Sequence, residues 1–211
     1  MRRVGIGSVT VAIGLLSSAC IYGTRYSYGT VFLEPQVSGS SRVAVATQDS
    51  RPYVVSRNKT PQFVGQIRAG FGIPYEVETG DGHPLAENMT TVIAAALARR
   101  GFQPQIVPVE PSASVEEVRN TLLRSGSERL LLLTLREWKS DAYLRVGLYY
   151  DVSLSVMDGS GKVLGEKTLQ GKDNLGGSID LSAYAKREVP ARFKAKMDEL
   201  FGAPSIASAL R

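Results

Sequence analysis

Few side chains in this sequence could do chemistry, and the most informative is its single cysteine, Cys20. The thiolate of a cysteine is a nucleophile. An unpaired thiol is a liability in an oxidising compartment, where cysteines normally form disulfides. The residues before Cys20 therefore decide which chemistry is expected of it.

A short leader precedes this cysteine. Arg2 and Arg3 form a positive start, and residues 4–19 carry no charge. A membrane-spanning helix needs about 20 apolar residues, whereas this stretch is shorter and is interrupted by glycines and serines. The pattern predicts a signal peptide over residues 1–19 that is removed from the mature chain.

The small residues Ser17, Ser18 and Ala19 before Cys20 resemble the lipobox of bacterial lipoproteins. That box usually has leucine three residues before the cysteine, where this chain has Ser17. The resemblance implies that the Cys20 thiol carries a covalent lipid, becomes the new amino terminus and holds the protein on a bilayer. The alternative is an ordinary signal peptide cleaved nearby, which leaves a free thiol. Because Ile21 is not acidic, the resemblance implies the periplasmic face of the bacterial outer membrane.

Two other features could suggest an active site. His83 is the only histidine and lies close to Asp81, but a general base needs an identifiable nucleophile or metal partner. We interpret it as an exposed turn residue before Pro84. Residues 159–162, Gly-Ser-Gly-Lys, match only the end of a phosphate-binding loop, so we predict a hairpin turn there. The sequence predicts no catalytic residue, no metal site and no cofactor other than the lipid, and hence a protein that is not an enzyme.

Composition limits the classes of partner. The 211 residues carry a net charge of +5, which falls by two without Arg2 and Arg3. Basic residues are scattered among acidic ones and form no stripe, so nucleic acid is not an expected partner. Hydrophobic residues make up 43% of the chain, which indicates a globular domain.

The hydrophobic pattern predicts a single α/β (α+β) domain over residues 42–203. It follows a flexible tether, residues 20–41, which is rich in Gly, Ser and Tyr, and precedes a tail, residues 204–211. Expected strands cover residues 42–47, 62–68, 73–77, 102–109, 130–135, 144–156 and 163–170. The first strand ends in a turn-prone segment, residues 49–52, which includes Arg51. Expected helices begin near Pro84, at Val115 after a capping box formed by Ser114 and Glu117, and after a glycine-rich loop at 171–177. The uninterrupted leucines of 130–135 predict a central strand, and 130–170 contains a long antiparallel hairpin. The prediction is a mixed sheet with two or three packed helices.

Aromatic residues cluster near this hairpin, among them Trp138, Tyr143 and Tyr149. Core or rim packing is one interpretation. The other is a flat aromatic contact for a partner, with Tyr149 on the polar face of its strand. Both interpretations stay open from the sequence alone.

The lipobox, a helix ending in Ala-Arg-Arg-Gly-Phe102, the leucine-rich strand and the long alternating strand together resemble the YajG-type family of bacterial outer-membrane lipoproteins. Auxiliary lipoproteins of envelope lipid-transport systems are a second similar group. The first resemblance implies a membrane-tethered, non-enzymatic module that binds an unidentified envelope protein or helps assemble an envelope complex. The alternative function is capture of a small amphiphile or a cell-wall fragment.

Overall fold

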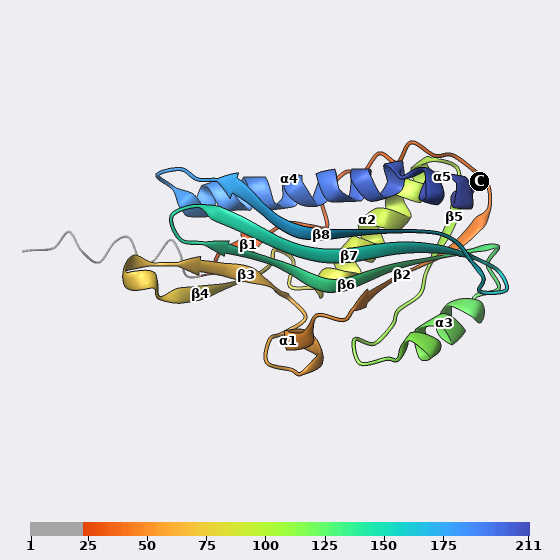
Figure 1. The fold of residues 1–211 in the computed structure, drawn as a ribbon, viewed down its shortest axis with the longest axis horizontal. Helices are drawn as coiled ribbons and strands as arrows, with labels where there is room; N and C mark the ends of the chain where they lie inside the picture. Colours follow the sequence, from red (N-terminus) through yellow and green to blue (C-terminus); the bar gives the residue numbers. More distant parts are fainter. Residues whose placement is uncertain (1–22) are drawn as a thin grey trace, which may run out of the picture.

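The computed structural model describes residues 23–211, and its eight strands form one mixed sheet that curls around a layer of helices (Figure 1). The elements are β1 (Arg25–Tyr26), β2 (Arg42–Asp49), α1 (Pro52–Val55), β3 (Phe63–Arg68), η1 (Gly70–Gly72), β4 (Pro74–Thr79), α2 (Leu85–Arg99), β5 (Gln103–Ile106), α3 (Val115–Leu123), β6 (Arg129–Ala142), β7 (Val146–Asp158), β8 (Val163–Gly176), α4 (Leu181–Gly202) and α5 (Pro204–Leu210). The predicted fold class, a single mixed α+β domain, is confirmed.

The centre of the sheet is β6, as its leucine run predicted. Leu131, Leu133 and Leu135 face the main core, while Leu130 packs in a smaller core on the opposite face. One edge of β6 pairs with antiparallel β7, which in turn pairs with β8. The opposite edge pairs with parallel β2 over its first half and with parallel β3 near its end. The sheet therefore forks along β6.

An irregularity in β6 marks this fork. Leu135 pairs with Val152 and Glu137 pairs with Asp151, so Arg136 is an extra residue in β6. A bulge of one residue exchanges the faces of all the side chains beyond it. Inward-facing residues are accordingly odd-numbered up to Leu135 and even-numbered from Trp138 onward.

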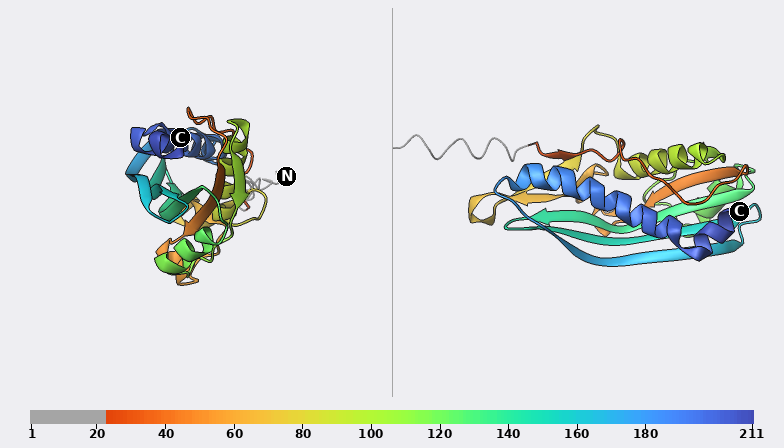
Figure 2. Two further views of the ribbon diagram at one scale, coloured as in Figure 1. Left: turned by 90° about the vertical axis from the view of Figure 1, so that its right-hand side faces the viewer. Right: turned by 90° about the horizontal axis from the view of Figure 1, so that it is seen from above.

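Helices cover both faces of the sheet. The long α4 lies along the hairpin strands with α2 beside it, whereas α3 lies on the other side, against β2 (Figures 1 and 2). A capping box begins α3 as predicted, because Ser114 Oγ accepts from the Glu117 backbone N–H at 3.2 Å and Glu117 accepts from the Ser114 N–H at 2.7 Å. The carboxylate of Asp180 caps α4 by accepting from Ala183 N–H at 2.9 Å.

The described part of the expected tether differs from the prediction. Residues 24–41, which we call the strap, lie on the domain and bury Tyr26, Tyr28, Leu33 and Val37 almost completely. Tyr26 and Tyr28 are two residues apart, so both rings point inward from an extended chain. The strap is consequently part of the folded domain.

Two further boundaries also differ. The expected tail is largely helix α5, whose Ile206 and Leu210 are buried against the core. The expected loop at 171–177 is mostly the last part of β8, which pairs with β7 as far as Gly176. Glycine suits position 171 because a Cβ there would lie 2.8 Å from the Tyr150 hydroxyl.

Candidate functional site

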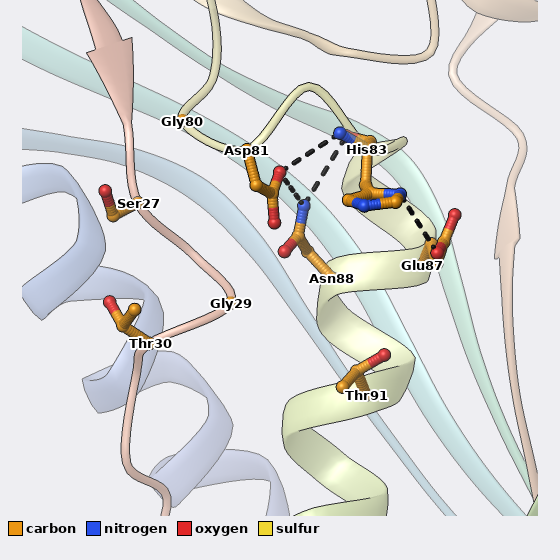
Figure 3. Close-up of a pocket in the computed structure, with 9 residues that line it drawn as sticks. All are labelled: Ser27, Gly29, Thr30, Gly80, Asp81, His83, Glu87, Asn88 and Thr91. Carbon is orange, nitrogen blue, oxygen red and sulfur yellow. Dashed lines mark hydrogen bonds and ion pairs between the residues drawn. The ribbon is translucent and has the colours of Figure 1, made fainter.

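A polar groove of about 500 Å³ lies where the strap meets the start of α2 (Figure 3). Its walls come from the strap, from the connection between β4 and α2, and from the first turns of α2. The lining residues are Ser27, Gly29, Thr30, Gly80, Asp81, His83, Glu87, Asn88 and Thr91.

The connection between β4 and α2 has a defined local conformation. Gly82 has φ of +77°, which glycine adopts without strain, and Pro84 precedes the first helical residue. Thr79 Oγ1 donates to the His83 carbonyl oxygen at 2.6 Å, and Gln62 Nε2 donates to that of Gly82 at 3.1 Å. These bonds hold the polar side chains of the connection beside the groove.

The strap approaches this connection very closely. A Cβ on Gly29 would lie 2.6 Å from Asn88 Oδ1 and 3.2 Å from Asp81 Oδ2. A Cβ on Gly80 would lie 2.9 Å from Ser27 Oγ. Glycines at 29 and 80 therefore allow the strap to form one wall of the groove.

Two carboxylates give the groove its charge. Asp81 Oδ1 accepts from Asn88 Nδ2 at 3.0 Å and from the His83 backbone N–H at 3.1 Å. Burial alone would raise the pKa of Asp81, but these hydrogen bonds outweigh it and lower that pKa. Glu87 Oε1 lies 3.2 Å from His83 Nδ1 (Figure 3). The groove thus presents acceptor oxygens that suit a positively charged or hydroxyl-bearing group.

A second depression shares Ser27 and Thr30 and extends along α4. It is lined by Ser27, Thr30, Val31, Phe32, Lys186, Pro190, Ala191 and Lys194. Arg99 covers the Phe32 ring at 4.0 Å from its centroid. Lys194 donates to Asp198 at 2.7 Å, which raises the Lys194 pKa. The strap consequently separates an acidic depression beside α2 from a basic one beside α4.

The predicted site residues lie in different places. Cys20, the predicted lipid site, lies outside the described residues. Trp138 is 0% exposed, donates from Nε1 to the Tyr28 hydroxyl at 3.0 Å and packs edge-on against Phe193. The interpretation of Trp138 as a partner contact is therefore wrong, because the bulge at Arg136 turns it into the core.

The two tyrosines lie nearer the surface. Tyr143 is exposed in the turn between β6 and β7. Tyr149 is half-buried on the outer face of β7, with Lys139 Nζ at 5.7 Å and Lys172 Nζ at 4.6 Å from its ring centroid. Neither tyrosine lines the groove, and their role as partner contacts stays a prediction.

The interpretation of His83 as an exposed turn residue is confirmed, since its side chain is 61% exposed. Sequence reasoning missed the groove itself. The turn at residues 81–84 was visible, but apart from the spacing of Tyr26 and Tyr28 nothing near Gly29 indicated that the strap would pack against it.

Within residues 23–211, no helix is long and apolar enough to cross a membrane. The same residues contain no group of three or more His, Cys, Asp or Glu side chains placed to hold a metal ion.

No family model and no curated protein sequence matches the chain. Solved structures do resemble it. Protein XCC0632 from Xanthomonas campestris, of family-model DUF330, has a TM-score of 0.55 and 14% identity over 89% of this chain and 98% of that chain. The PelC dodecamer from Paraburkholderia phytofirmans has a TM-score of 0.39 and 13% identity over 78% of this chain and 91% of that chain. Lipoprotein GNA1162 from Neisseria meningitidis has a TM-score of 0.33 and 14% identity over 76% of this chain and 97% of that chain. The likeness to XCC0632 shows a shared fold, while the resemblance to YajG-type lipoproteins stays a prediction.

Proposed function

We propose that the protein is a lipid-anchored periplasmic lipoprotein of the bacterial outer membrane that acts as a non-enzymatic binding or assembly module for an envelope complex. The observation that carries the proposal is the packing of the strap. The folded domain begins within a few residues of Cys20, so a lipid there would hold the groove at a limited distance from the bilayer.

The strap is fastened at several points between Cys20 and β2. The Thr24 and Ser182 hydroxyls are hydrogen-bonded at 2.9 Å, and Tyr28 accepts from Trp138. Further along, Arg99 donates to the Leu33 carbonyl at 3.1 Å. These contacts join the strap to α4, the sheet and α2, so an anchor upstream of it would act on the whole domain.

The groove supports a polar macromolecular partner. Small-molecule pockets are usually lined by large hydrophobic and aromatic side chains, whereas this groove is lined by glycines and by residues with oxygen or nitrogen in the side chain, and by no large aliphatic residue. Asp81 is also a poor general base, because a base works best with a pKa near the working pH and that of Asp81 is lowered. Its carboxylate is better suited to binding a lysine, an arginine or a hydroxyl group of an envelope protein.

The alternative, a binder of a small amphiphile or cell-wall fragment, would use the depression beside Phe32. Capture between the sheet and α4 is disfavoured, since Tyr28, Trp138, Phe193 and Phe201 fill that space and are buried. Phe32 is exposed and basic residues lie near it, which suits an acidic amphiphile at the surface.

The test is photocrosslinking in cells from an artificial amino acid at Thr91, an exposed groove position, with Val115 on α3 as the matched exposed control. We expect one envelope protein to be captured from position 91 and not from 115. Capture should fall in Asp81→Asn and in Cys20→Ser. A Cys20→Ser protein that still fractionates wholly with membranes would refute the anchor, and capture of lipid alone would support the alternative.

A further inference from the structure

Exposed apolar side chains gather at one end of the molecule. Phe71 and Ile179 are 103% and 109% exposed, Leu144 is 80% exposed, and Ile73 and Tyr143 are also exposed. They belong to three connections: β3 to β4, β6 to β7, and β8 to α4. We call these five residues the apolar tip.

The sheet register brings these connections together. Ile67 at the end of β3 pairs in parallel with Ala142 at the end of β6, so the turns that follow leave the sheet side by side. A Cβ on Gly177 would lie 3.0 Å from the Leu144 carbonyl oxygen, which places the third connection against the second. Figure 1 and the right-hand view of Figure 2 show the three connections at one end of the molecule. The described chain starts near this end, and α3 and α5 lie at the opposite end.

The turn at Phe71 is unusual in itself. Phe71 has φ of +61°, in the left-handed region that bulky residues rarely adopt. Its fully exposed ring makes no packing contact that would compensate for this strain. Strained residues of this kind tend to occur where they contact a ligand or partner. A partner that covers the tip would bury the ring.

We propose that the apolar tip inserts into the interfacial layer of the phospholipid bilayer to which Cys20 is attached, and so orients the domain on the membrane. This inference rests on the proposed lipid anchor. Arg145 follows Leu144 in the same connection, beside the aromatic and aliphatic side chains of the tip, and makes no ion pair among the described residues. Aromatic rings favour the headgroup level, and an arginine can pair with lipid phosphate.

The length of the upstream chain selects the bilayer as the partner. β1 runs parallel to β4, and Arg25 pairs with Glu78. Arg25 is five positions after Cys20, and five steps of extended chain span at most about 18 Å. Glu78 is likewise five positions after Ile73, which lies just before β4. The reach of a lipid on Cys20 therefore includes the tip, and any surface covering the tip must compete with the bilayer.

The experiment uses the lipidated full chain, reconstituted in vesicles of phosphatidylethanolamine and phosphatidylglycerol with or without brominated lipid. Trp138 is the only tryptophan and is buried, so it provides a constant background. Phe71→Trp and Ile179→Trp each add a reporter at the tip, and Val115→Trp adds a matched exposed reporter at the far end. Vesicle flotation of the same samples, with Cys20→Ser as the unanchored control, reports the anchor separately.

We expect brominated lipid to remove most of the emission added at positions 71 and 179 and to leave that at 115 unchanged. Adding Leu144→Asp should abolish the quenching while the protein still floats. Flotation without quenching at either tip position would overturn the inference and leave the anchor standing. A blue shift that depends on protein concentration and not on bromine would instead show a second copy covering the tip, and would also overturn it. Failure to float would refute the anchor, and this inference with it.

Discussion

Replacement of Tyr28 tests whether the strap is part of the cooperative fold. The ring is buried, its hydroxyl accepts a hydrogen bond from Trp138 Nε1 at 3.0 Å, and it packs edge-on against Phe193 with ring centroids 5.5 Å apart. Tyr28→Phe keeps the ring and leaves the buried indole N–H without its acceptor. A lost partner of this kind costs about 1–3 kcal/mol of the free energy of unfolding.

Tyr28→Ala removes the ring as well. Large-to-small substitutions of buried aromatic residues cost about 3–5 kcal/mol through lost transfer energy and the remaining cavity. Together with the lost acceptor, we expect a total loss of at least about 4 kcal/mol. A segment that was only a tether would contribute almost nothing.

The assay is urea unfolding followed by the fluorescence of Trp138, the only tryptophan in the chain and the direct partner of Tyr28. Phe32→Ala is the matched control, because Phe32 is an aromatic residue of the same strap but is exposed. We expect the control to cost less than about 1 kcal/mol. If Tyr28→Ala changes the free energy of unfolding no more than Phe32→Ala does, the strap is not part of the cooperative unit.

Three further predictions follow from other contacts. Arg51→Met should cost about 3–5 kcal/mol of unfolding free energy, because it leaves the carboxylate of Asp49 buried without its partner, and Asp49→Asn combined with Arg51→Met should recover part of that loss in urea unfolding. Burial raises the pKa of Tyr26 to about 12 in the folded protein, against 10.0 ordinarily. The stabilisation that the protonated Tyr26 gives the folded protein is therefore fully present below pH 10 and is lost as the pH rises towards 12. The contribution of Tyr26 to the free energy of unfolding should fall by about 2–3 kcal/mol over that range. Burial also raises the pKa of Tyr28 and Tyr53, so tyrosinate absorbance should show several late-ionising tyrosines, and Tyr26→Phe should reduce their number by one. Gly29→Ala should displace the strap from Asn88 and speed backbone hydrogen exchange in residues 24–41, whereas Gly202→Ala, where a Cβ would meet nothing within 4 Å, should not.

Much of the fold follows from local patterns in the sequence. Alternation in residues 144–156 predicted β7, the leucine run predicted the centre of the sheet, and Ser114 with Glu117 predicted the start of α3. These features depend on side-chain periodicity and capping within one short segment. Local segments therefore identified most of the elements and their burial.

Features that depend on distant contacts were missed. The bulge at Arg136 lies where β6 changes partners from β2 to β3, and no pattern near Arg136 marks it. Arg51 looked like a turn residue, yet it is fully buried at this fork. It donates to the Asp49 carboxylate and to the carbonyl oxygens of Phe63 and Trp138. A buried arginine is satisfied only by groups that folding brings together, so a single sequence does not reveal it.

The same limitation applies to the groove. Asp81 and His83 were visible as polar residues near a helix start, but the groove exists only because the strap returns to the domain and Gly29 passes beside Asn88. Glycine and serine content favoured a flexible tether. The inward alternation of Tyr26 and Tyr28 was the one local indication to the contrary, and two residues are too few to establish a period.

The packed strap also limits where a partner could meet the protein. With a lipid on Cys20, Ser27 at the edge of the groove is seven residues from the anchor and hence within about 25 Å of the bilayer, even if that stretch is fully extended. The pairing of β1 with β4 and the bond from Thr24 to Ser182 leave little freedom to change this distance. A partner that binds the groove must therefore present its basic or hydroxyl groups close to the membrane surface. Two proteins would test this limit, one with a flexible insertion before Gly23 and one with the same insertion in the turn at residues 159–161. The pair distinguishes an effect of the distance between anchor and groove from an effect of an insertion on folding. Both should fold, and only the first should lower crosslinking from Thr91.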